Sequence, residues 1–227
     1  MFNKAKFIED CEILKQALDK IKFYRGTERR TGAFKHAKCN DKDGGSMLFG
    51  TTWKGFLKYD KEGNMVKRTP ADVKGLYYTK CRDLYPELGL VLQDFADKYL
   101  GDFEYTQCQL NKNFQSPPHF DSKNMGESYI VGLGDYTGGR LHIKQPSSFG
   151  GMLTRKEDIK NRLLCFNGSK YEHWVEDYTG TRYSVVFFNN NKKSKLRKNK
   201  SLSDIAEEDS KDSNDSNFTN SENPMEK

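Results

Sequence analysis

The chain has 227 residues, of which 35% are hydrophobic and 13% aromatic, and its formal net charge is +6. No run of about 18 consecutive apolar residues occurs, which argues against a membrane-spanning helix and a membrane partner. The N-terminal residues show no signal peptide, and five scattered cysteines without a CxxC pair exclude a disulfide framework and a cysteine-rich zinc site. We therefore expect an intracellular protein, cytoplasmic or nuclear and not secreted, with free thiols.

The charge is distributed unevenly along the chain. Residues 192–200, KKSKLRKNK, carry +6 and residues 201–227 carry −6, so residues 1–191 keep a net +6. A basic body fits an anionic partner such as DNA or RNA, but a lysine-rich surface kept for solubility explains the charge equally well. The basic run fits a localisation signal, a phosphate-binding arm or a linker paired with the acidic tail.

The first part of the chain predicts a helix followed by a loop and extended structure. Apolar residues recur at three- and four-residue steps over residues 3–24, which predicts an amphipathic helix. Residues 25–45, rich in Gly, Arg and Lys, predict a basic loop. Residues 46–59 predict a strand or hairpin, and DKEGN at 60–64 is a turn signal.

Helical signals continue as far as residue 101, and strand signals follow. Residues 69–72, Thr-Pro-Ala-Asp, are typical of a helix start. A second helix is predicted over 86–100, ending at Gly101. From residue 103, strands are predicted near 103–110, 118–121, 128–134, 140–144, 163–166, 171–176 and 182–189. Short strands at this spacing indicate a barrel or sandwich, whereas the tail from residue 192 is too polar to fold.

Three side chains predict a metal site. His119 and Asp121 are two residues apart in a strand-like segment, so both point to the same side. His173 follows 52 residues later in a second strand-like segment, YEHWVED. Two imidazoles and one carboxylate on one side of an ion leave the opposite positions open, as in the facial triad of non-haem Fe(II) oxygenases.

Nine residues after His173, a strand-like segment carries an arginine and a serine on one face. Arg182, Ser184 and Val186 share this face by alternation. A guanidinium inside an apolar barrel needs an anion. A dicarboxylate ligand would supply one, paired with Arg182 and hydrogen-bonded by Ser184, while its other end chelates the metal.

The order of these motifs resembles the Fe(II)/2-oxoglutarate-dependent dioxygenase superfamily. The resemblance covers roughly residues 103–189 and includes the HxD triplet, Gly138-Gly139-Arg140-Leu141, the distal histidine and the R-x-S segment. It implies an α+β fold with a mainly β core, a double-stranded β-helix (jelly roll) with N-terminal helices packed on it.

The resemblance also implies the chemistry of the site. His119, Asp121 and His173 would hold Fe(II), and Arg182 and Ser184 would bind the co-substrate 2-oxoglutarate. The enzyme would use O2 to hydroxylate an unactivated C–H bond. We expect one monomeric oxygenase domain over 1–191, with helical support over 1–102 and the jelly-roll core over 103–191. A disordered tail over 192–227 would follow.

Residues 111–143 are most similar to the Tet/JBP-like nucleobase oxygenases, which oxidise the methyl group of thymine or 5-methylcytosine. The shared elements include Asn111, Asn113, Asn124 and Gly-Asp-Tyr before Gly-Gly. A base in duplex DNA would have to be flipped out to reach the iron. The GG-x-L segment also occurs in protein prolyl hydroxylases, so a protein or small-molecule hydroxylase remains an alternative. A jelly-roll binding module without turnover is the other.

Other polar residues are further candidates for binding co-substrate or substrate. Tyr105 and Asn113 are candidates for the co-substrate pocket, although asparagine is also common in turns. Candidates for substrate contact are Asn124, Arg29, Arg30 and His36, the last three within the basic loop. His142 is predicted to lie at the surface or the core edge rather than to ligate metal.

Overall fold

The structure is a computed structural model that describes residues 3–23, 38–39, 44–55, 58–59, 65–66 and 73–190. Residues 25–37 of the predicted basic loop, with Arg29, Arg30 and His36, lie outside these residues, as does the predicted tail over 192–227. Within the rest of that loop, Lys38–Cys39 and Gly45 belong to strands. The proposed division of the chain into a 1–191 domain and a tail therefore stays a prediction. Within the described residues, no helix has the length and apolar character needed to cross a membrane.

Three helices belong to the described residues of the N-terminal half. Helix α1 spans Lys4–Asp19, and the Asn3 side chain caps it by accepting from the Lys6 N–H at 3.1 Å. Helices α2 (Lys80–Leu84) and α3 (Pro86–Tyr99) follow one another, and α3 has its proline in the first turn, where no N–H is needed. The predicted helices over 3–24 and 86–100 are thus confirmed, with α1 ending earlier.

A six-stranded antiparallel sheet forms the centre of the fold. Its strand order is β12 (Leu163–Phe166), β8 (Ser128–Leu133), β15 (Tyr183–Phe188), β6 (Gln107–Lys112), β2 (Gly45–Gly55) and β5 (Val73–Tyr78). Strand β15 therefore lies between β8 and β6, which places the predicted R-x-S segment at the middle of the sheet.

A smaller sheet faces this main sheet. It contains β11 (Met152–Glu157), β10 (Leu141–Pro146) and β13 (Glu172–Val175), all antiparallel. Three short pairs complete the described strands: β9 (Tyr136–Gly138) with β14 (Tyr178–Gly180), β1 (Lys38–Cys39) with β7 (Phe114–Gln115), and β3 (Lys58–Tyr59) with β4 (Met65–Val66).

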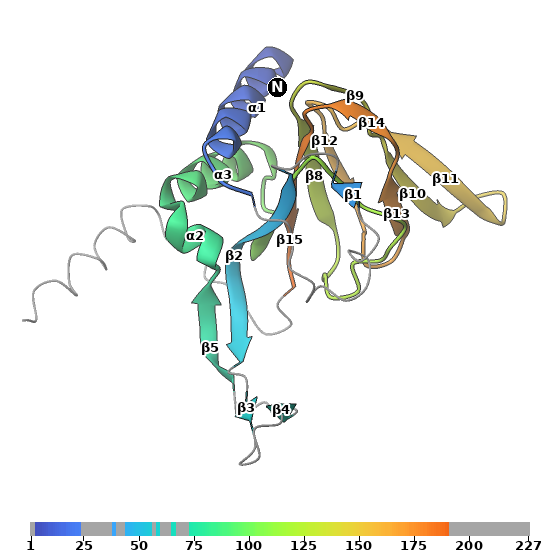
Figure 1. The fold of residues 1–227 in the computed structure, drawn as a ribbon. Helices are drawn as coiled ribbons and strands as arrows, with labels where there is room; N and C mark the ends of the chain where they lie inside the picture. The colour runs from blue at the N-terminus through green and yellow to red at the C-terminus, as the bar shows by residue number, and fades with distance from the viewer. Residues whose placement is uncertain are drawn as a thin grey trace, which may run out of the picture. The chain divides into compact units, whose positions relative to one another are not determined.

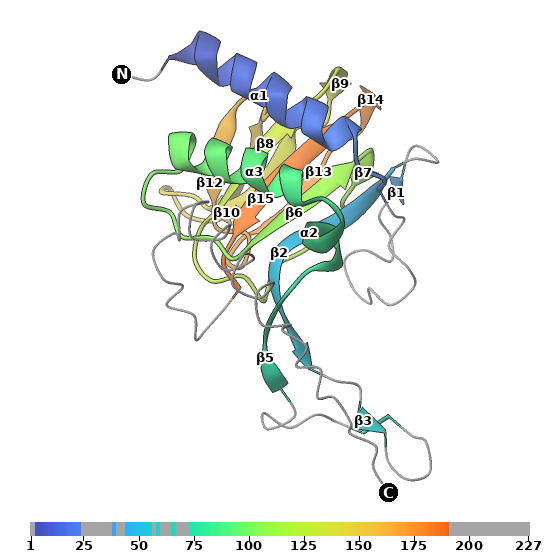
Figure 2. The ribbon, with the colours of Figure 1, turned by 90° about the vertical axis from the view of Figure 1, so that its left-hand side faces the viewer.

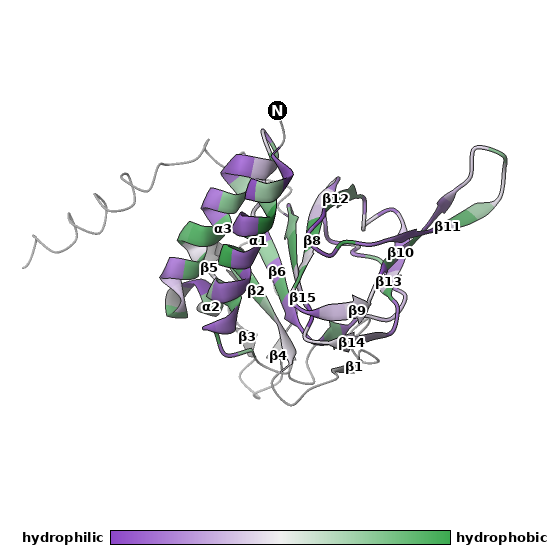
Figure 3. Ribbon diagram, turned by 90° about the horizontal axis from the view of Figure 1, so that it is seen from above, coloured by the Kyte–Doolittle hydropathy of each residue, from purple (hydrophilic) through white to green (hydrophobic). Residues whose placement is uncertain are grey.

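The elements form three layers. Helices α1 and α3 cover one side of the main sheet, and the smaller sheet lies on the other (Figures 1 and 2). Figure 3, seen from above, shows the same order of helices, main sheet and smaller sheet. One core cluster packs the helices onto the main sheet, and a second fills the space between the two sheets. This architecture is the expected double-stranded β-helix with N-terminal helices packed on it.

Several local predictions differ from the structure. The helix start over 69–72 lies outside the described residues, and the segment after it, VKGLYY, forms strand β5. Its β-branched and aromatic residues favour an extended backbone, and the next helix, α2, begins only after the cap at Thr79. Residues 118–121 form a single β-bridge instead of a strand. Strand β11 was missed because its solvent-exposed residues give no alternating pattern.

The four cysteines whose side chains the structure describes agree with the prediction of free thiols. Cys11, Cys81 and Cys108 are buried and unpaired, and Cys165 is exposed and unpaired. Burial raises the pKa of Cys11 to about 12 and that of Cys81 to about 11, so both remain protonated packing residues at neutral pH.

Candidate active site

The two predicted ligand segments meet through a β-bridge. His119 and His173 pair antiparallel and exchange two backbone hydrogen bonds, from His119 N–H to His173 O at 3.1 Å and back at 3.0 Å. His173 belongs to β13, where it also pairs with Ile143 of β10. The bridge therefore joins a segment outside regular structure to the smaller sheet, and it brings two histidines 54 positions apart in the numbering to one point.

His119, Asp121 and His173 form one cluster whose ligand atoms all lie within 4.8 Å of one another. The His119 Nε2 and the Asp121 Oδ1 are 3.6 Å apart, and the His173 Nε2 is 3.6 Å from Oδ2. The two imidazole centroids are separated by 4.2 Å. Both Nε2 atoms and the carboxylate thus face a common centre, as the sequence predicted.

The other ring nitrogen of each histidine faces a backbone carbonyl. His119 Nδ1 lies 2.7 Å from the Pro117 oxygen, and His173 Nδ1 lies 3.0 Å from the Tyr171 oxygen. Since a carbonyl only accepts, each Nδ1 carries a hydrogen, which leaves Nε2 as the ring nitrogen that can offer a lone pair to a metal. Burial and the nearby His173 lower the pKa of His119, which favours its neutral form.

Asp121 is held in place by its neighbours. Its N–H donates to the Gly168 oxygen at 2.9 Å, and Asn124 Nδ2 donates to Asp121 Oδ2 at 3.3 Å. Burial raises the pKa of the Asp121 carboxyl, but its interactions with His173 and His119 outweigh burial, so the pKa lies below its ordinary value. Asn124, predicted to contact substrate, is thus placed where it orients the Asp121 carboxylate.

Gly168 leaves room for this cluster. A Cβ at this position would lie 3.0 Å from Asp121 Oδ2 and 3.1 Å from His173 Cε1. Phe166 packs edge-on against His173 with the ring centroids 5.1 Å apart. The donor set is therefore closed by protein on one side, and sequence patterns gave no signal for Gly168 beyond an ordinary turn.

Arg182 occupies the space between the two sheets. Its side chain is 1% exposed, and its Nε and Nη2 have no hydrogen-bond partner. The guanidinium carbon lies 5.4 Å from the Tyr136 ring centroid and 5.6 Å from that of Tyr178. Burial lowers the pKa of Arg182 below its ordinary value, yet a guanidinium stays charged in proteins. A buried cation with unsatisfied donors fits an anionic ligand.

Two further hydroxyls lie beside Arg182. Arg182 directly precedes β15, and Ser184, 3% exposed, follows two positions later, so alternation along the chain turns both side chains the same way. The Tyr136 hydroxyl is buried next to the guanidinium, and a Cβ on Gly132, the strand neighbour of Ser184, would collide with it. Gly139 makes room for the arginine, because a Cβ there would lie 2.9 Å from Arg182 Nε. Tyr136 was missed by sequence analysis, although the turn Gly-Asp-Tyr was noted.

The structure separates the two other co-substrate candidates. Asn113 has a positive φ of 47°, and its Oδ1 accepts from the Arg182 backbone N–H at 2.8 Å, so it fixes the backbone that carries the guanidinium. Tyr105 lies on the opposite side of the main sheet. It packs against Phe187 at 5.1 Å and donates to Gln93 of α3 at 3.2 Å. Tyr105 is therefore a helix-packing residue, because it precedes β6 on the helix side.

His142 does not join the metal cluster. His142 of β10 pairs with Trp174 of β13, which is the residue after His173. Because neighbouring residues of a strand point to opposite faces, the His142 side chain points to the outer face of the smaller sheet, away from His173. The His142 Nε2 lies 2.8 Å from Glu176 Oε2, and Glu176 also pairs with Arg140 at 2.7 Å. The hydrogen bond from Arg140 lowers the pKa of Glu176 to about 2 against the opposing effect of burial.

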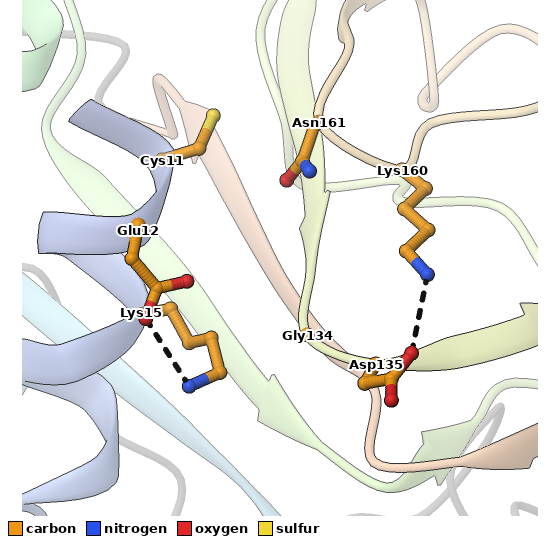
Figure 4. Close-up of a pocket in the computed structure, with 7 residues that line it drawn as sticks. All are labelled: Cys11, Glu12, Lys15, Gly134, Asp135, Lys160 and Asn161. Carbon is orange, nitrogen blue, oxygen red and sulfur yellow. Dashed lines mark ion pairs between the residues drawn. The ribbon is translucent and has the colours of Figure 1, made fainter. Parts of the chain in front are cut away.

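A pocket of about 260 Å³ lies apart from these residues, between α1 and two loops of the β core (Figure 4). It is lined by Cys11, Glu12, Lys15, Gly134, Asp135, Lys160 and Asn161. Ion pairs of 3.5 Å between Lys15 and Glu12 and of 3.6 Å between Lys160 and Asp135 balance its charges. None of the predicted site residues lines this pocket.

No family model matches the chain, and no curated protein matches it. Solved structures do. A 2OG-Fe(II) oxygenase family oxidoreductase from Burkholderia pseudomallei is 17% identical over 54% of this chain and 64% of its own, with a TM-score of 0.37. The chain thus spans less than two thirds of that protein.

A prolyl-4-hydroxylase from Pseudomonas putida is 12% identical, with 84% of this chain and 89% of its own covered and a TM-score of 0.40. NgTET1 in complex with 5mC DNA is 13% identical, with 92% and 77% covered and a TM-score of 0.41.

Proposed function

We propose that the chain is an Fe(II)- and 2-oxoglutarate-dependent dioxygenase that hydroxylates an unactivated C–H bond. The observation that carries the proposal is the pairing of two features in one inter-sheet space. A two-histidine, one-carboxylate cluster lies at its edge, and a buried arginine with unpartnered donors lies among its tyrosines. Phe166, Tyr136 and Tyr178 belong to the same core cluster, which links the two features.

The donor set fits iron. Two imidazoles and a carboxylate from one side leave open coordination positions, and the nitrogen–oxygen set suits Fe(II). When bound, Fe(II) with 2-oxoglutarate and O2 supplies the oxidising chemistry that a protein side chain lacks. His119 and His173 are oriented for this by the Pro117 and Tyr171 carbonyls. Asn124 orients Asp121.

The second half of the site fits a dicarboxylate. Arg182 would pair with its distal carboxylate, with the Ser184 and Tyr136 hydroxyls as further donors. The surrounding apolar residues, including Ile143 and Val186, exclude water and strengthen that pairing. The co-substrate would thus supply the negative charge that pairs with the buried arginine.

An anaerobic titration of the protein with Fe(II) and 2-oxoglutarate tests this assignment. A visible metal-to-ligand charge-transfer band is expected, and His119→Ala or Asp121→Ala should abolish it. Arg182→Ala should raise the 2-oxoglutarate concentration needed to produce the band, while leaving iron binding largely intact. His142→Ala is the matched control, since this histidine lies on the outer face, and it should behave as wild type. A band that survives Asp121→Ala would overturn the ligand assignment.

For the substrate, we propose the methyl group of a modified base, thymine or 5-methylcytosine, in nucleic acid. The similarity of residues 111–143 to nucleobase oxygenases and the +6 charge of residues 1–191 support this choice. Mass spectrometry of DNA and RNA incubated with the loaded enzyme should detect the oxidised base. Peptide-stimulated succinate formation without base oxidation would favour a protein hydroxylase, and metal binding without any turnover would favour a binding module.

A further inference from the structure

A chain of hydrogen bonds crosses the inner face of the main sheet and ends at Ser184. Its members, which we call the amide–hydroxyl chain, are Gln109, Ser46, Asn111 and Ser184, from β6, β2, β6 and β15. Gln109 Nε2 lies 2.7 Å from Ser46 Oγ, which lies 2.6 Å from Asn111 Oδ1. Asn111 Nδ2 in turn lies 3.1 Å from Ser184 Oγ. Ser46 and Ser184 are 5% and 3% exposed, so water does not compete for these bonds.

The direction of the chain is fixed at its far end by the backbone. Gln109 Nε2 also lies 2.8 Å from the Met47 carbonyl oxygen. A carbonyl only accepts, so the Gln109 atom facing it must be the amide nitrogen. That nitrogen donates its second hydrogen to Ser46, whose hydroxyl then donates to Asn111 Oδ1. The Asn111 nitrogen is thereby left to donate to Ser184.

This direction determines what the Ser184 hydroxyl can do. Its oxygen already accepts from Asn111, so its own hydrogen cannot point back along the chain. Among the described residues, the bond from Asn111 is the one hydrogen bond of this hydroxyl, and the hydroxyl donates none. Arg182, two residues away on the same face of the strand, likewise has Nε and Nη2 without partners. Both groups are donors that lack an acceptor.

We propose that Asn111 is a positioning residue for the co-substrate, holding the Ser184 hydroxyl as a donor toward the carboxylate that Arg182 binds. The inference rests on the proposed function, since it assigns a role to the same pocket. Ser46 and Gln109 act at one remove, by fixing the orientation of the Asn111 amide. Because Ser46 comes from β2, the N-terminal part of the chain contributes to a pocket whose other residues begin at Gln109.

The substitution Asn111→Asp tests the proposal with almost no change in shape. A carboxylate accepts from Ser184 instead of donating to it, so the serine hydrogen turns away from the ligand. The affinity of the Fe(II)-loaded full chain for 2-oxoglutarate should fall about 10- to 100-fold, the scale of a hydrogen bond to a charged group. Affinity is measured anaerobically, by calorimetry or by the charge-transfer band.

A second ligand separates positioning from general damage. 2-Oxobutyrate has the metal-chelating 2-oxo acid but no distal carboxylate, so Asn111→Asp should change its affinity by less than about twofold. Asn161→Asp, the same change at a turn outside the inter-sheet space, should leave both affinities as in wild type. Equal loss for both ligands, or no loss for either, would overturn the proposal. If wild type binds neither ligand, the proposed function itself fails.

A double-mutant cycle decides the question even if the aspartate variant does not fold. Ser46→Ala removes the hydrogen that orients Asn111 and introduces no charge, and a loss of about threefold in 2-oxoglutarate affinity is expected. In a Ser184→Ala background, the same substitution should have no effect, because it acts through the serine. Equal losses of affinity from Ser46→Ala in both backgrounds would contradict the proposal that the amide–hydroxyl chain acts through Ser184.

Discussion

The two faces of the main sheet differ in what they require from the rest of the molecule. Along β15, Tyr183, Val185 and Phe187 point toward the helices and belong to the larger core cluster. Arg182 and Ser184 alternate with them and point into the inter-sheet space. One face is apolar and packed against rings, whereas the other holds polar groups that the described residues leave partly unsatisfied.

The contrast shows how one strand serves stability and binding at once. Because successive side chains point to opposite sides, a six-residue strand supplies three core residues without interrupting a ligand pocket. The helix-facing residues stabilise the fold in the absence of any ligand. The inner residues reduce stability until a ligand supplies the missing anion. Substitutions on the helix-facing side should therefore lower stability and leave ligand affinity unchanged, whereas substitutions on the inner side should lower ligand affinity without lowering stability.

Phe187→Ala should produce the largest effect, and only on stability. Phe187 is fully buried, and its ring stacks on Phe95 of α3 with the centroids 6.1 Å apart. Loss of this contact and the resulting cavity should lower the free energy of unfolding by about 3–5 kcal/mol. Denaturant unfolding measures the change, and 2-oxoglutarate affinity of the folded fraction should be retained. A loss of affinity without a loss of stability would contradict the division between the faces.

Arg182→Met should raise the stability of the ligand-free protein and lower its affinity for 2-oxoglutarate. The substitution removes an uncompensated buried charge and fills the same volume, so the ligand-free protein should become more stable by about 1–2 kcal/mol. Affinity for 2-oxoglutarate should fall about 100-fold, because the distal carboxylate loses its paired cation. Thermal unfolding with and without 2-oxoglutarate measures both effects. Stabilisation of this variant by the ligand to the wild-type extent would show that Arg182 does not bind it.

The two ligand segments around His119 and His173, and the inward-facing Arg182, could be recognised because local patterns determine them. The HxD triplet and the alternation along residues 182–188 require only knowledge of how side chains point from an extended backbone. The meeting of His119 with His173 depends on a β-bridge between distant segments, which the sequence indicates only through resemblance. The fold class followed from strand spacing together with that same resemblance.

Contacts between distant elements were beyond sequence reasoning. Tyr105 precedes a strand and carries a hydroxyl, which suits a pocket, but the side of the sheet on which it lies depends on the register of β6. Its contact with Gln93 of α3 appears only when the helix is in place. Gly168 and Tyr136 were missed for the same reason, because their importance comes from what they approach and not from neighbours in sequence.

The helix side of the sheet also contains a buried charge, and it provides the last test of the comparison. Asp10 of α1 is 4% exposed, as buried as many core residues, but it has its partners. Tyr99 donates to it at 2.6 Å, and Lys98 and Lys6 lie 3.4 and 3.5 Å away. Burial raises the pKa of Asp10, but these partners outweigh burial and hold it below the ordinary value of 3.8.

Asp10→Asn should therefore lower the free energy of unfolding by about 1 kcal/mol at neutral pH, discounted because both lysines are exposed to solvent. Since the folded pKa lies below 3.8, the stability from this carboxylate is complete above pH 3.8 and disappears as the pH falls through the lower folded value. The difference between wild type and variant should shrink over that window. The exposed Asp94→Asn serves as control, with a smaller effect. If the stability difference between wild type and Asp10→Asn persists unchanged to low pH, packing and not the carboxylate charge stabilises the contact between α1 and α3. Asp10 would then not be an example of a buried charge stabilised by its partners, and the comparison with Arg182 would fail.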